Sequence, residues 1–211
     1  MMDLEKGLRR GRAGRRTGVP EAVIADFETR AVGERLIDVA YATVDSPLGR
    51  LLAASTKKGL IRLSYENEPL DAALEHLAVT VSPRIVESPK RLDAVRRELD
   101  EYFEGRRTAF DIAIDWSFAA GFVQRVLKAT ARIPFGSVRS YAQVAEKAGS
   151  PRGSRAAGNA LGSNPVPIVV PCHRVLRSGG AIGGYTGGLH RKEFLLHLEG
   201  VQPPPNPRKR L

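Results

Sequence analysis

Residues 140–162, "SYAQVAEKAGSPRGSRAAGNALG", give the clearest indication of the fold of the second half of the chain. It holds two short helical patterns joined by a tight Gly-Ser turn, which is the arrangement of a helix-turn-helix. Ser140, with Gln143 three residues later, has the pattern of a capping box and predicts the start of the first helix. Ser150 followed by Pro151 predicts the start of the second, with Ser150 as the N-cap residue.

The second of these helices consists almost entirely of small residues. They are Gly153, Ala156, Ala157, Gly158 and Ala160. Close packing against a neighbouring helix explains such a composition, and so does close approach of the backbone to DNA, with Arg152, Arg155 and Asn159 projecting. The formal net charge of +10 favours the DNA interpretation.

Downstream, "VVPCHRV", residues 169–175, contains the only cysteine of the chain. We expect a short buried strand over residues 168–170, ended by Pro171, so that Cys172 lies where the chain turns. One interpretation of Cys172 is a buried structural cysteine, which behaves as a small hydrophobe. The other is a reactive thiol that His173 draws toward the thiolate form.

A nucleophile and its base usually need a third group that orients the base. Glu199 lies in the last turn of a predicted helix, where the helix dipole disfavours a carboxylate. Such a charge is expected to have a local partner, and His173 is one candidate. Plain solvent exposure of Glu199 is the alternative.

The rest of the chain predicts an α+β fold, with a small N-terminal antiparallel sheet and helices followed by a mostly helical C-terminal domain. Strand patterns run from Leu36 to Tyr65, with helices expected over residues 69–81, 88–105 and 119–136. A last helix, over residues 190–200, is expected to bury Phe194, Leu195 and Leu198. The expected divisions are a basic, flexible extension (1–35) with a short helix near its end, an α/β domain (36–115), a DNA-binding domain (116–200) and a basic tail (201–211).

Composition excludes several classes of protein. Hydrophobic residues make up 42% of the chain, which is too high for a disordered protein. No apolar run approaches the roughly 20 residues of a membrane span, and we expect neither secretion nor a membrane partner. A lone cysteine cannot form an internal disulfide, which suits a cytoplasmic protein.

Taken together, three segments resemble the methylated-DNA–protein-cysteine methyltransferases, also called O6-alkylguanine-DNA alkyltransferases. The matching pieces are "IPFGSVRSYAQVA", "SRAAGNALGSNPVPIVVPCHRV" and "GGYTGGLHRKEFLLHLEG". The combination of P-C-H-R with a preceding N-P and a following G-G-L…K…L-L…E is highly specific, and the N-terminal sheet fits the family only loosely.

The resemblance implies a DNA-repair protein that moves an alkyl group from O6-alkylguanine, and from O4-methylthymine, to its own cysteine, once per molecule. Cys172 would be the acceptor, His173 would assist its deprotonation through a water molecule, and Glu199 would orient His173. Tyr141 would donate to the departing guanine. The residues that support the active site or line the substrate pocket would be Asn164, Val170, Pro171, Arg174, Tyr185 and Thr186.

The resemblance also implies that the reading helix lies in the minor groove of double-stranded DNA, with Arg155 filling the gap left by the flipped nucleotide. The expected DNA contacts are Ser140, Arg152, Arg155, Ala156, Gly158 and Asn159. We expect a monomer that clusters on DNA, no cofactor and no metal, because the zinc ligands of some relatives have no counterpart here.

Two other classes of function compete with this one. A helix-turn-helix regulator or damage sensor would bind DNA and leave Cys172 unused. A cysteine hydrolase would turn over many substrates per molecule, whereas an alkyl acceptor is used up in a single stoichiometric burst.

Overall fold

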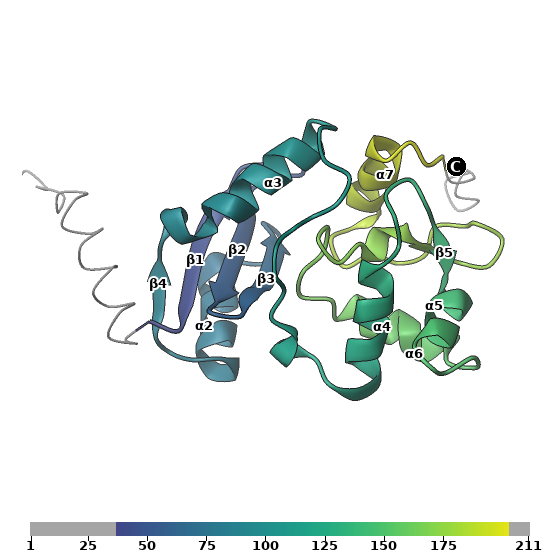
Figure 1. The fold of residues 1–211 in the computed structure, drawn as a ribbon, viewed down its shortest axis with the longest axis horizontal. Helices are drawn as coiled ribbons and strands as arrows, with labels where there is room; N and C mark the ends of the chain where they lie inside the picture. The colour runs from purple at the N-terminus through teal and green to yellow at the C-terminus, as the bar shows by residue number, and fades with distance from the viewer. Residues whose placement is uncertain (1–36, 203–211) are drawn as a thin grey trace, which may run out of the picture. The chain divides into compact units, whose positions relative to one another are not determined.

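The computed structural model describes residues 37–202. The expectations for the basic N-terminal extension, its short helix and the tail beyond residue 202 therefore fall outside the described residues. None of the helices among residues 37–202 is long and apolar enough to cross a membrane. Figure 1 shows a sheet with its helices in the N-terminal part of this region and a cluster of helices and loops in the C-terminal part.

The N-terminal part is organised around a four-stranded sheet with the order β3-β2-β1-β4. Its strands are β1 (Val39–Val44), β2 (Leu51–Thr56), β3 (Gly59–Tyr65) and β4 (Ile85–Glu87). The first three form the expected antiparallel meander. The sheet is nevertheless mixed, because the chain returns through α2 (Leu70–Thr80) to the far edge, where β4 pairs with β1 in parallel.

One face of this sheet is covered by a short 3₁₀ helix, η1 (Pro89–Leu92), and by α3 (Asp93–Phe103). Leu92, Val95 and Leu99 recur at helical spacing and are buried against strand residues such as Leu51. Tyr102 is also fully buried, and it belongs to the same continuous core as the helices of the C-terminal part.

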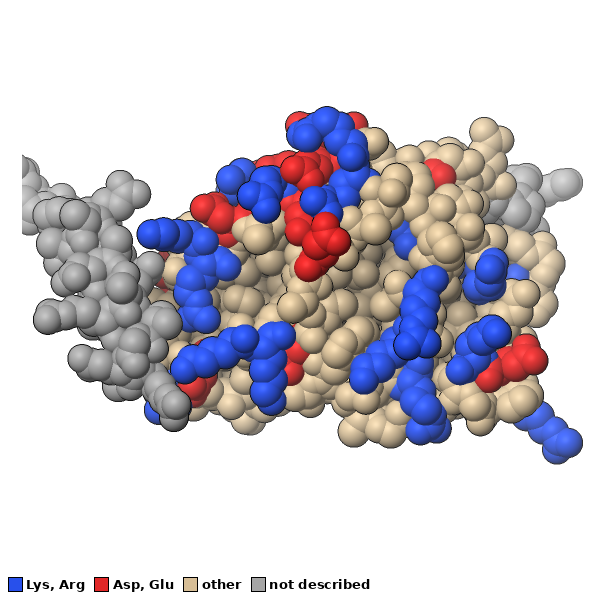
Figure 2. Space-filling view, viewed as in Figure 1, with Lys and Arg blue, Asp and Glu red and all other residues tan. Residues whose placement is uncertain are grey.

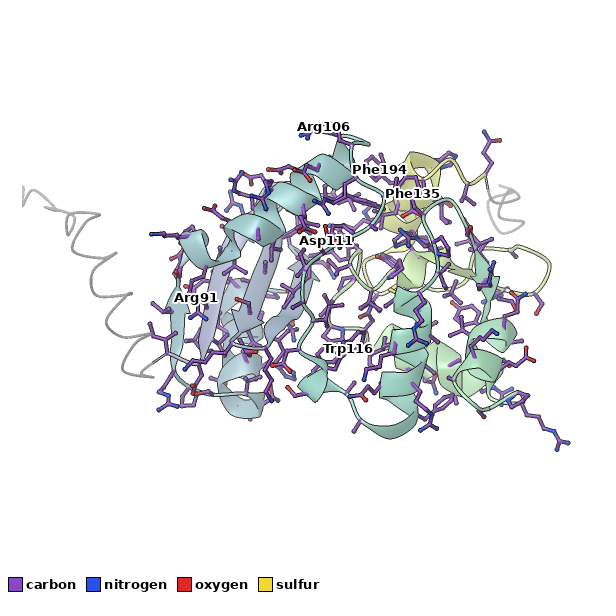
Figure 3. All side chains as sticks on the ribbon, in the orientation of Figure 1. Arg91, Arg106, Asp111, Trp116, Phe135 and Phe194 are labelled. Carbon is purple, nitrogen blue, oxygen red and sulfur yellow. The ribbon has the colours of Figure 1, made fainter. Side chains whose placement is uncertain are left out.

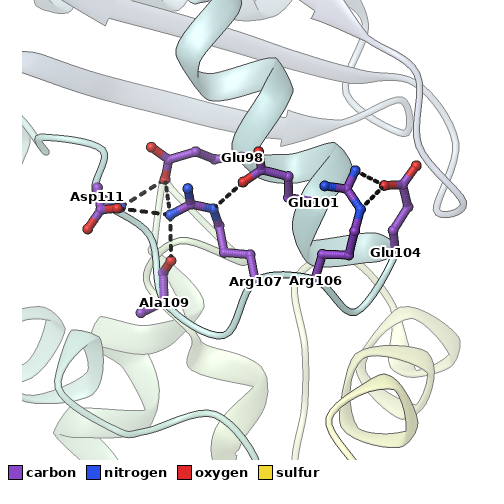
Figure 4. Close-up of polar contacts among 7 residues, drawn as sticks. All are labelled: Glu98, Glu101, Glu104, Arg106, Arg107, Ala109 and Asp111. Atoms are coloured by element: carbon purple, nitrogen blue, oxygen red, sulfur yellow. Dashed lines mark hydrogen bonds and ion pairs between the residues drawn. The ribbon is translucent and has the colours of Figure 1, made fainter.

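Arg107 links the end of α3 to residues 109–111 of the segment that follows the helix (Figure 4). The Arg107 guanidinium contacts the carboxylates of Glu98, Glu101 and Asp111. It also donates to the Ala109 carbonyl at 2.9 Å. The buried Glu98 carboxylate accepts the Asp111 backbone N–H at 2.8 Å, so this carboxylate does not lie unpaired in the interior.

The C-terminal part contains four helices and a two-stranded parallel ribbon. After η2 (Trp116–Phe118) come α4 (Gly121–Ala131), β5 (Arg139–Ser140), α5 (Tyr141–Lys147), α6 (Ser154–Gly162), η3 (Cys172–Arg174), β6 (Val175–Leu176) and α7 (Leu189–Leu198). Figure 3 labels Trp116, which lies beside α4 in that view. Its indole ring is 5.6 Å from the Lys128 ammonium of that helix.

The helix-turn-helix pattern is confirmed in its first helix and corrected at the start of its second. The Ser140 hydroxyl accepts the Gln143 N–H, and the Gln143 side chain accepts the Ser140 N–H, so the capping box is complete. The N-cap of α6 is Gly153 and not Ser150. Residues 150–153 instead form a turn, closed by a hydrogen bond from the Gly153 N–H to the Ser150 carbonyl.

Two further expectations are wrong in detail. Residues 168–170 are buried as predicted, but they form turns and not a strand. Prolines at 165, 167 and 171 withhold backbone donors, and Ile168 has a left-handed φ of 73°, which no strand accepts. On α7, Phe194 (labelled in Figure 3) is 38% exposed and not buried as expected. Leu195 is buried as expected, and Leu196 is buried in place of Phe194.

Candidate active site

Cys172 is the first residue of η3, directly after Pro171, so the expectation that the cysteine lies at a turn is confirmed. Its side chain is almost fully buried, at 8% exposure. The proline cannot donate a backbone hydrogen bond, and the chain bends there into a single 3₁₀ turn. The next two side chains, His173 and Arg174, are buried with it.

Asn164 holds this turn and contacts the sulfur. Its amide nitrogen donates to the Val170 carbonyl at 2.9 Å and to the Cys172 Sγ at 3.1 Å, and its oxygen accepts the Val166 N–H. Burial raises the pKa of the Cys172 thiol, and the hydrogen bond from Asn164 works in the opposite direction. The resting sulfur is therefore protonated, with a donor in place that stabilises the thiolate once it forms.

His173 and Glu199 are in contact, so of the two interpretations of Glu199 the local partner is confirmed and solvent exposure is wrong. The His173 Nε2 lies 2.8 Å from the Glu199 Oε1, and both side chains are buried. Burial lowers the pKa of His173, so the imidazole is neutral at rest. With Nε2–H donating to Glu199, the unprotonated nitrogen is Nδ1, which has no hydrogen-bond partner among the described residues.

Glu199 is the centre of a buried polar cluster. Arg174 donates to both of its oxygens at 2.8 Å, and the Tyr102 hydroxyl donates to Oε1 at 2.7 Å. Burial alone would raise the pKa of Glu199, but the hydrogen bonds from His173 and Arg174 outweigh it and lower the pKa to about 2. The Arg174 guanidinium is thus directed toward Glu199 and the Ile133 carbonyl, and not toward the sulfur.

Lys192, which the sequence patterns did not single out as a site residue, is the other buried cation near Cys172. Its ammonium donates to the Val175 carbonyl, and its positive charge lowers the pKa of the thiol. Burial in turn lowers the pKa of Lys192 to about 8. Lys192, Leu195, Leu196 and Glu199 are spaced i, i+3, i+4, i+7, so the helical period alone places Lys192 on the buried face that carries Glu199.

A cavity of about 820 Å³ opens in front of the cysteine. Its wall is formed by the start of α5, by one side of α6 and by the loop over residues 177–186. Among the predicted site residues, those on the wall are Tyr141, Arg155, Gly158, Asn159, Cys172, Tyr185 and Thr186. Arg177 also lines it and was missed, because nothing near it in the sequence distinguishes it from other exposed arginines.

The remaining predicted residues lie elsewhere. Ser140 caps α5, while Val170, Pro171, Arg174, His173 and Glu199 are buried and do not line the cavity. Arg152, just before α6, and Ala156, within α6, are exposed but are not part of the cavity wall.

Tyr141 projects into this cavity from the first turn of α5, close to two glycines. A Cβ atom on Gly183 would lie 2.5 Å from the Tyr141 hydroxyl, and one on Gly158 would lie 3.7 Å from its ring. The loop can therefore approach the hydroxyl only because residue 183 has no side chain. Burial and the nearby Cys172 raise the pKa of Tyr141, which keeps the phenol protonated.

The loop over the cavity is held at its C-terminal end by two side-chain hydrogen bonds. The Thr186 hydroxyl donates to the Gly162 carbonyl at the end of α6, at 2.8 Å. The hydroxyls of Tyr185 and Tyr65 lie 2.7 Å apart and join the loop to β3 of the N-terminal sheet. Tyr65 was missed as a site residue because its partner is distant in sequence.

The donor set of the site offers nothing for a metal ion. No group of three or more His, Cys, Asp or Glu side chains within residues 37–202 is arranged to hold one. The polar groups around Cys172 are suited to proton transfer and to stabilising a thiolate.

Comparison with known proteins identifies the family. Residues 39–116 match the model of the 6-O-methylguanine DNA methyltransferase, ribonuclease-like domain, and residues 121–201 match the model of the 6-O-methylguanine DNA methyltransferase, DNA binding domain. A methylated-DNA–protein-cysteine methyltransferase of Mycobacterium tuberculosis is 37% identical over 166 residues, which covers 79% of this chain and 95% of the relative.

Solved structures agree. The crystal structure of Mycobacterium tuberculosis O6-methylguanine methyltransferase superposes with a TM-score of 0.67 at 37% identity, over 79% of this chain and 96% of that one. The crystal structure of Mycobacterium tuberculosis OGT in complex with DNA gives 0.66 at 38% identity, over 76% and 92%. The chain therefore belongs to the 6-O-methylguanine DNA methyltransferase family.

Proposed function

We propose that this protein repairs DNA by moving the alkyl group of O6-alkylguanine, and of O4-methylthymine, to the sulfur of Cys172. The observation that carries the proposal is one buried thiol on the wall of a cavity of about 820 Å³. The residue that follows it, His173, is buried with its Nε2 at 2.8 Å from Glu199. The family membership supports the same activity.

The substrate base must leave the DNA stack before the thiol can reach it. We propose that α6 enters the minor groove, which is about 6 Å wide and suits a helix of small residues. Arg155 lies on the cavity wall, is exposed and pairs with no carboxylate within residues 37–202. Its guanidinium would fill the gap left by the flipped nucleotide and offset part of the unstacking cost of a few kcal/mol.

The remaining DNA contacts surround this wedge. Ser140, Arg152, Ala156, Gly158 and Asn159 lie on or beside the two helices of the motif, and they would contact the sugar-phosphate backbone and the groove floor. Double-stranded DNA is the only partner that the transfer step requires. All of the chemical groups come from one chain, so we propose that a monomer is active and that clustering occurs only along DNA.

In the transfer step, the Cys172 proton passes through a water molecule to the Nδ1 of His173, and Glu199 stabilises the resulting imidazolium. The thiolate attacks the alkyl carbon, so that a C–S bond forms while the bond from that carbon to O6 breaks. Guanine leaves with a proton from Tyr141, whose raised pKa keeps its phenol protonated until that moment. His173 then returns its proton to the phenolate through solvent.

The product is a thioether, which has no thiol–disulfide exchange route back to the thiol. The chain has no second cysteine. We therefore propose a single transfer per molecule, carried out in the cytoplasm, where a free thiol stays reduced.

The stoichiometry of the reaction tests this function. Excess duplex containing O6-methylguanine should lose about one methyl group for each protein molecule and then no more. Cys172→Ser should bind the duplex as the natural chain does and transfer nothing. Continued turnover would indicate a hydrolase, and transfer by Cys172→Ser would remove the proposed acceptor.

A further inference from the structure

A second cavity, of about 640 Å³, lies between α4 and α5 and is lined by five cationic side chains. They are Arg125, Lys128, Arg132, Arg139 and Lys147. Glu146 is the only carboxylate residue on its wall. We call this feature the α4–α5 groove.

The cations of the α4–α5 groove are exposed, and none of them forms an ion pair within residues 37–202. Arg125 and Arg139 donate only to the backbone carbonyls of Ala148 and Val138. Lys128 donates to the neutral Gln124 side chain. Most arginines of the sheet region behave differently, since six of the eight between residues 37 and 118 pair with carboxylates, namely Arg50, Arg62, Arg84, Arg96, Arg106 and Arg107.

Figure 2 shows this contrast on one face of the molecule. Red and blue side chains are mixed over α3, at the top of the view, whereas blue side chains dominate over α4 and α5. Between Ala119 and Gly200 the only carboxylates are Glu146, Glu193 and Glu199, and Glu199 is buried. The groove therefore carries a positive charge that residues 37–202 do not neutralise.

The groove is separate from the cavity in front of Cys172. Tyr141 and Ala142 of α5 line the Cys172 cavity, whereas Gln143, Glu146 and Lys147 line the groove. No residue of α5 lines both cavities. The neighbouring helices follow the same division, because α6 lines only the Cys172 cavity and α4 lines only the groove.

We propose that the α4–α5 groove binds the phosphate backbone of a second DNA segment while the first segment occupies the Cys172 cavity. Clustered, unpaired arginines and lysines along a groove are the usual means of holding a phosphodiester chain. The choice of DNA as the polyanion rests on the proposed function. No residue lines both cavities, so the groove is available to a phosphodiester chain while the Cys172 cavity is occupied.

The test uses the full chain and two short duplexes with different labels. One duplex contains O6-methylguanine and a donor dye, and the second is undamaged and carries an acceptor dye. We expect protein-dependent energy transfer between them. Arg132→Gln combined with Lys147→Gln should strongly reduce the energy transfer, because both side chains line the groove and neither has a hydrogen bond or ion pair to another described residue.

The matched control is Lys57→Gln combined with Lys58→Gln, which removes the same charge from the exposed turn between β2 and β3. It should retain the energy transfer. The groove variant lacks two cations that would each neutralise a phosphate. The slope of log K against log salt concentration, for binding of the second duplex, should therefore become shallower by about 1.8. The control variant should keep the slope of the natural chain.

Absence of energy transfer with the natural chain, or equal transfer by the groove variant, would overturn the proposal. Methyl gain on Cys172, measured by mass in the same samples, reads the proposed function separately. If the protein brings the duplexes together without gaining a methyl group, the groove stands as a polyanion-binding site and the proposed repair activity is wrong.

Discussion

The two sides of Cys172 are built on opposite principles. On the buried side, Arg174, His173 and Tyr102 are joined to Glu199 by hydrogen bonds in the interior. On the open side, Arg155 on α6 is exposed and has no carboxylate partner among the described residues. The buried side keeps the His173 imidazole neutral and the Glu199 carboxylate ionised. The open side leaves the Arg155 guanidinium available to bind a ligand of negative charge.

Removing the charge of Glu199 should have the largest effect on the buried side. Glu199→Gln leaves the Arg174 guanidinium buried beside a neutral amide, which should cost about 3–5 kcal/mol of unfolding free energy. The transfer rate should fall by about 100-fold or more, because His173 loses the partner that stabilises its charged form. Urea denaturation and single-turnover transfer measure the two effects.

The matched control is Asp100→Asn, which removes an exposed partner of Arg96. It should change stability by less than about 1 kcal/mol and leave transfer unchanged. Equal losses of unfolding free energy in Glu199→Gln and Asp100→Asn would show that the buried cluster stabilises the fold no more than an exposed ion pair does.

The pH dependence of stability should reveal the same cluster. The pKa of Glu199 is about 2 in the folded protein against the ordinary 4.5, so folding favours its charged form. This contribution is present in full above about pH 5 and is lost as the pH falls toward 2, a change of about 3 kcal/mol. The unfolding free energy of the natural chain should drop more steeply over this range than that of Glu199→Gln, and parallel curves would contradict the assignment.

The open side is tested by Arg155→Ala. Single-turnover transfer from O6-methylguanine in a duplex should slow by about 10- to 100-fold, because the unstacking cost is no longer offset. Transfer from the free base O6-methylguanine should hardly change. Arg152→Ala is the control, since Arg152 lies off the cavity wall and should weaken binding without slowing transfer at saturating duplex. Equal losses on the duplex and on the free base would remove the wedge role.

The smallest effect is expected at the link between the loop and the sheet. Tyr65→Phe removes the hydroxyl that lies 2.7 Å from that of Tyr185 and leaves a buried group without this partner. It should cost about 1–2 kcal/mol of unfolding free energy. Tyr41→Phe, on β1, is the control and should be nearly neutral in thermal unfolding. A neutral Tyr65→Phe would show that the loop does not depend on the sheet.

The sequence predicted those parts of the site that depend on local patterns. The capping box of Ser140, the turn at Cys172 and the charge of Glu199 at a helix end are visible within a few residues. The prediction of a strand before Cys172 was wrong because three prolines and the left-handed Ile168 override an apolar run. Tyr65 and Tyr102 escaped notice because their partners, Tyr185 and Glu199, are distant in sequence and no local pattern links them.

The most direct test of the central claim is the intact mass of the protein after incubation with duplex DNA containing O6-methylguanine, followed by peptide mapping. We expect a gain of one methyl group, on the peptide that contains Cys172, and no gain in Cys172→Ser. An unchanged mass after the DNA has lost its methyl group, or a methyl group on any other residue, would contradict it.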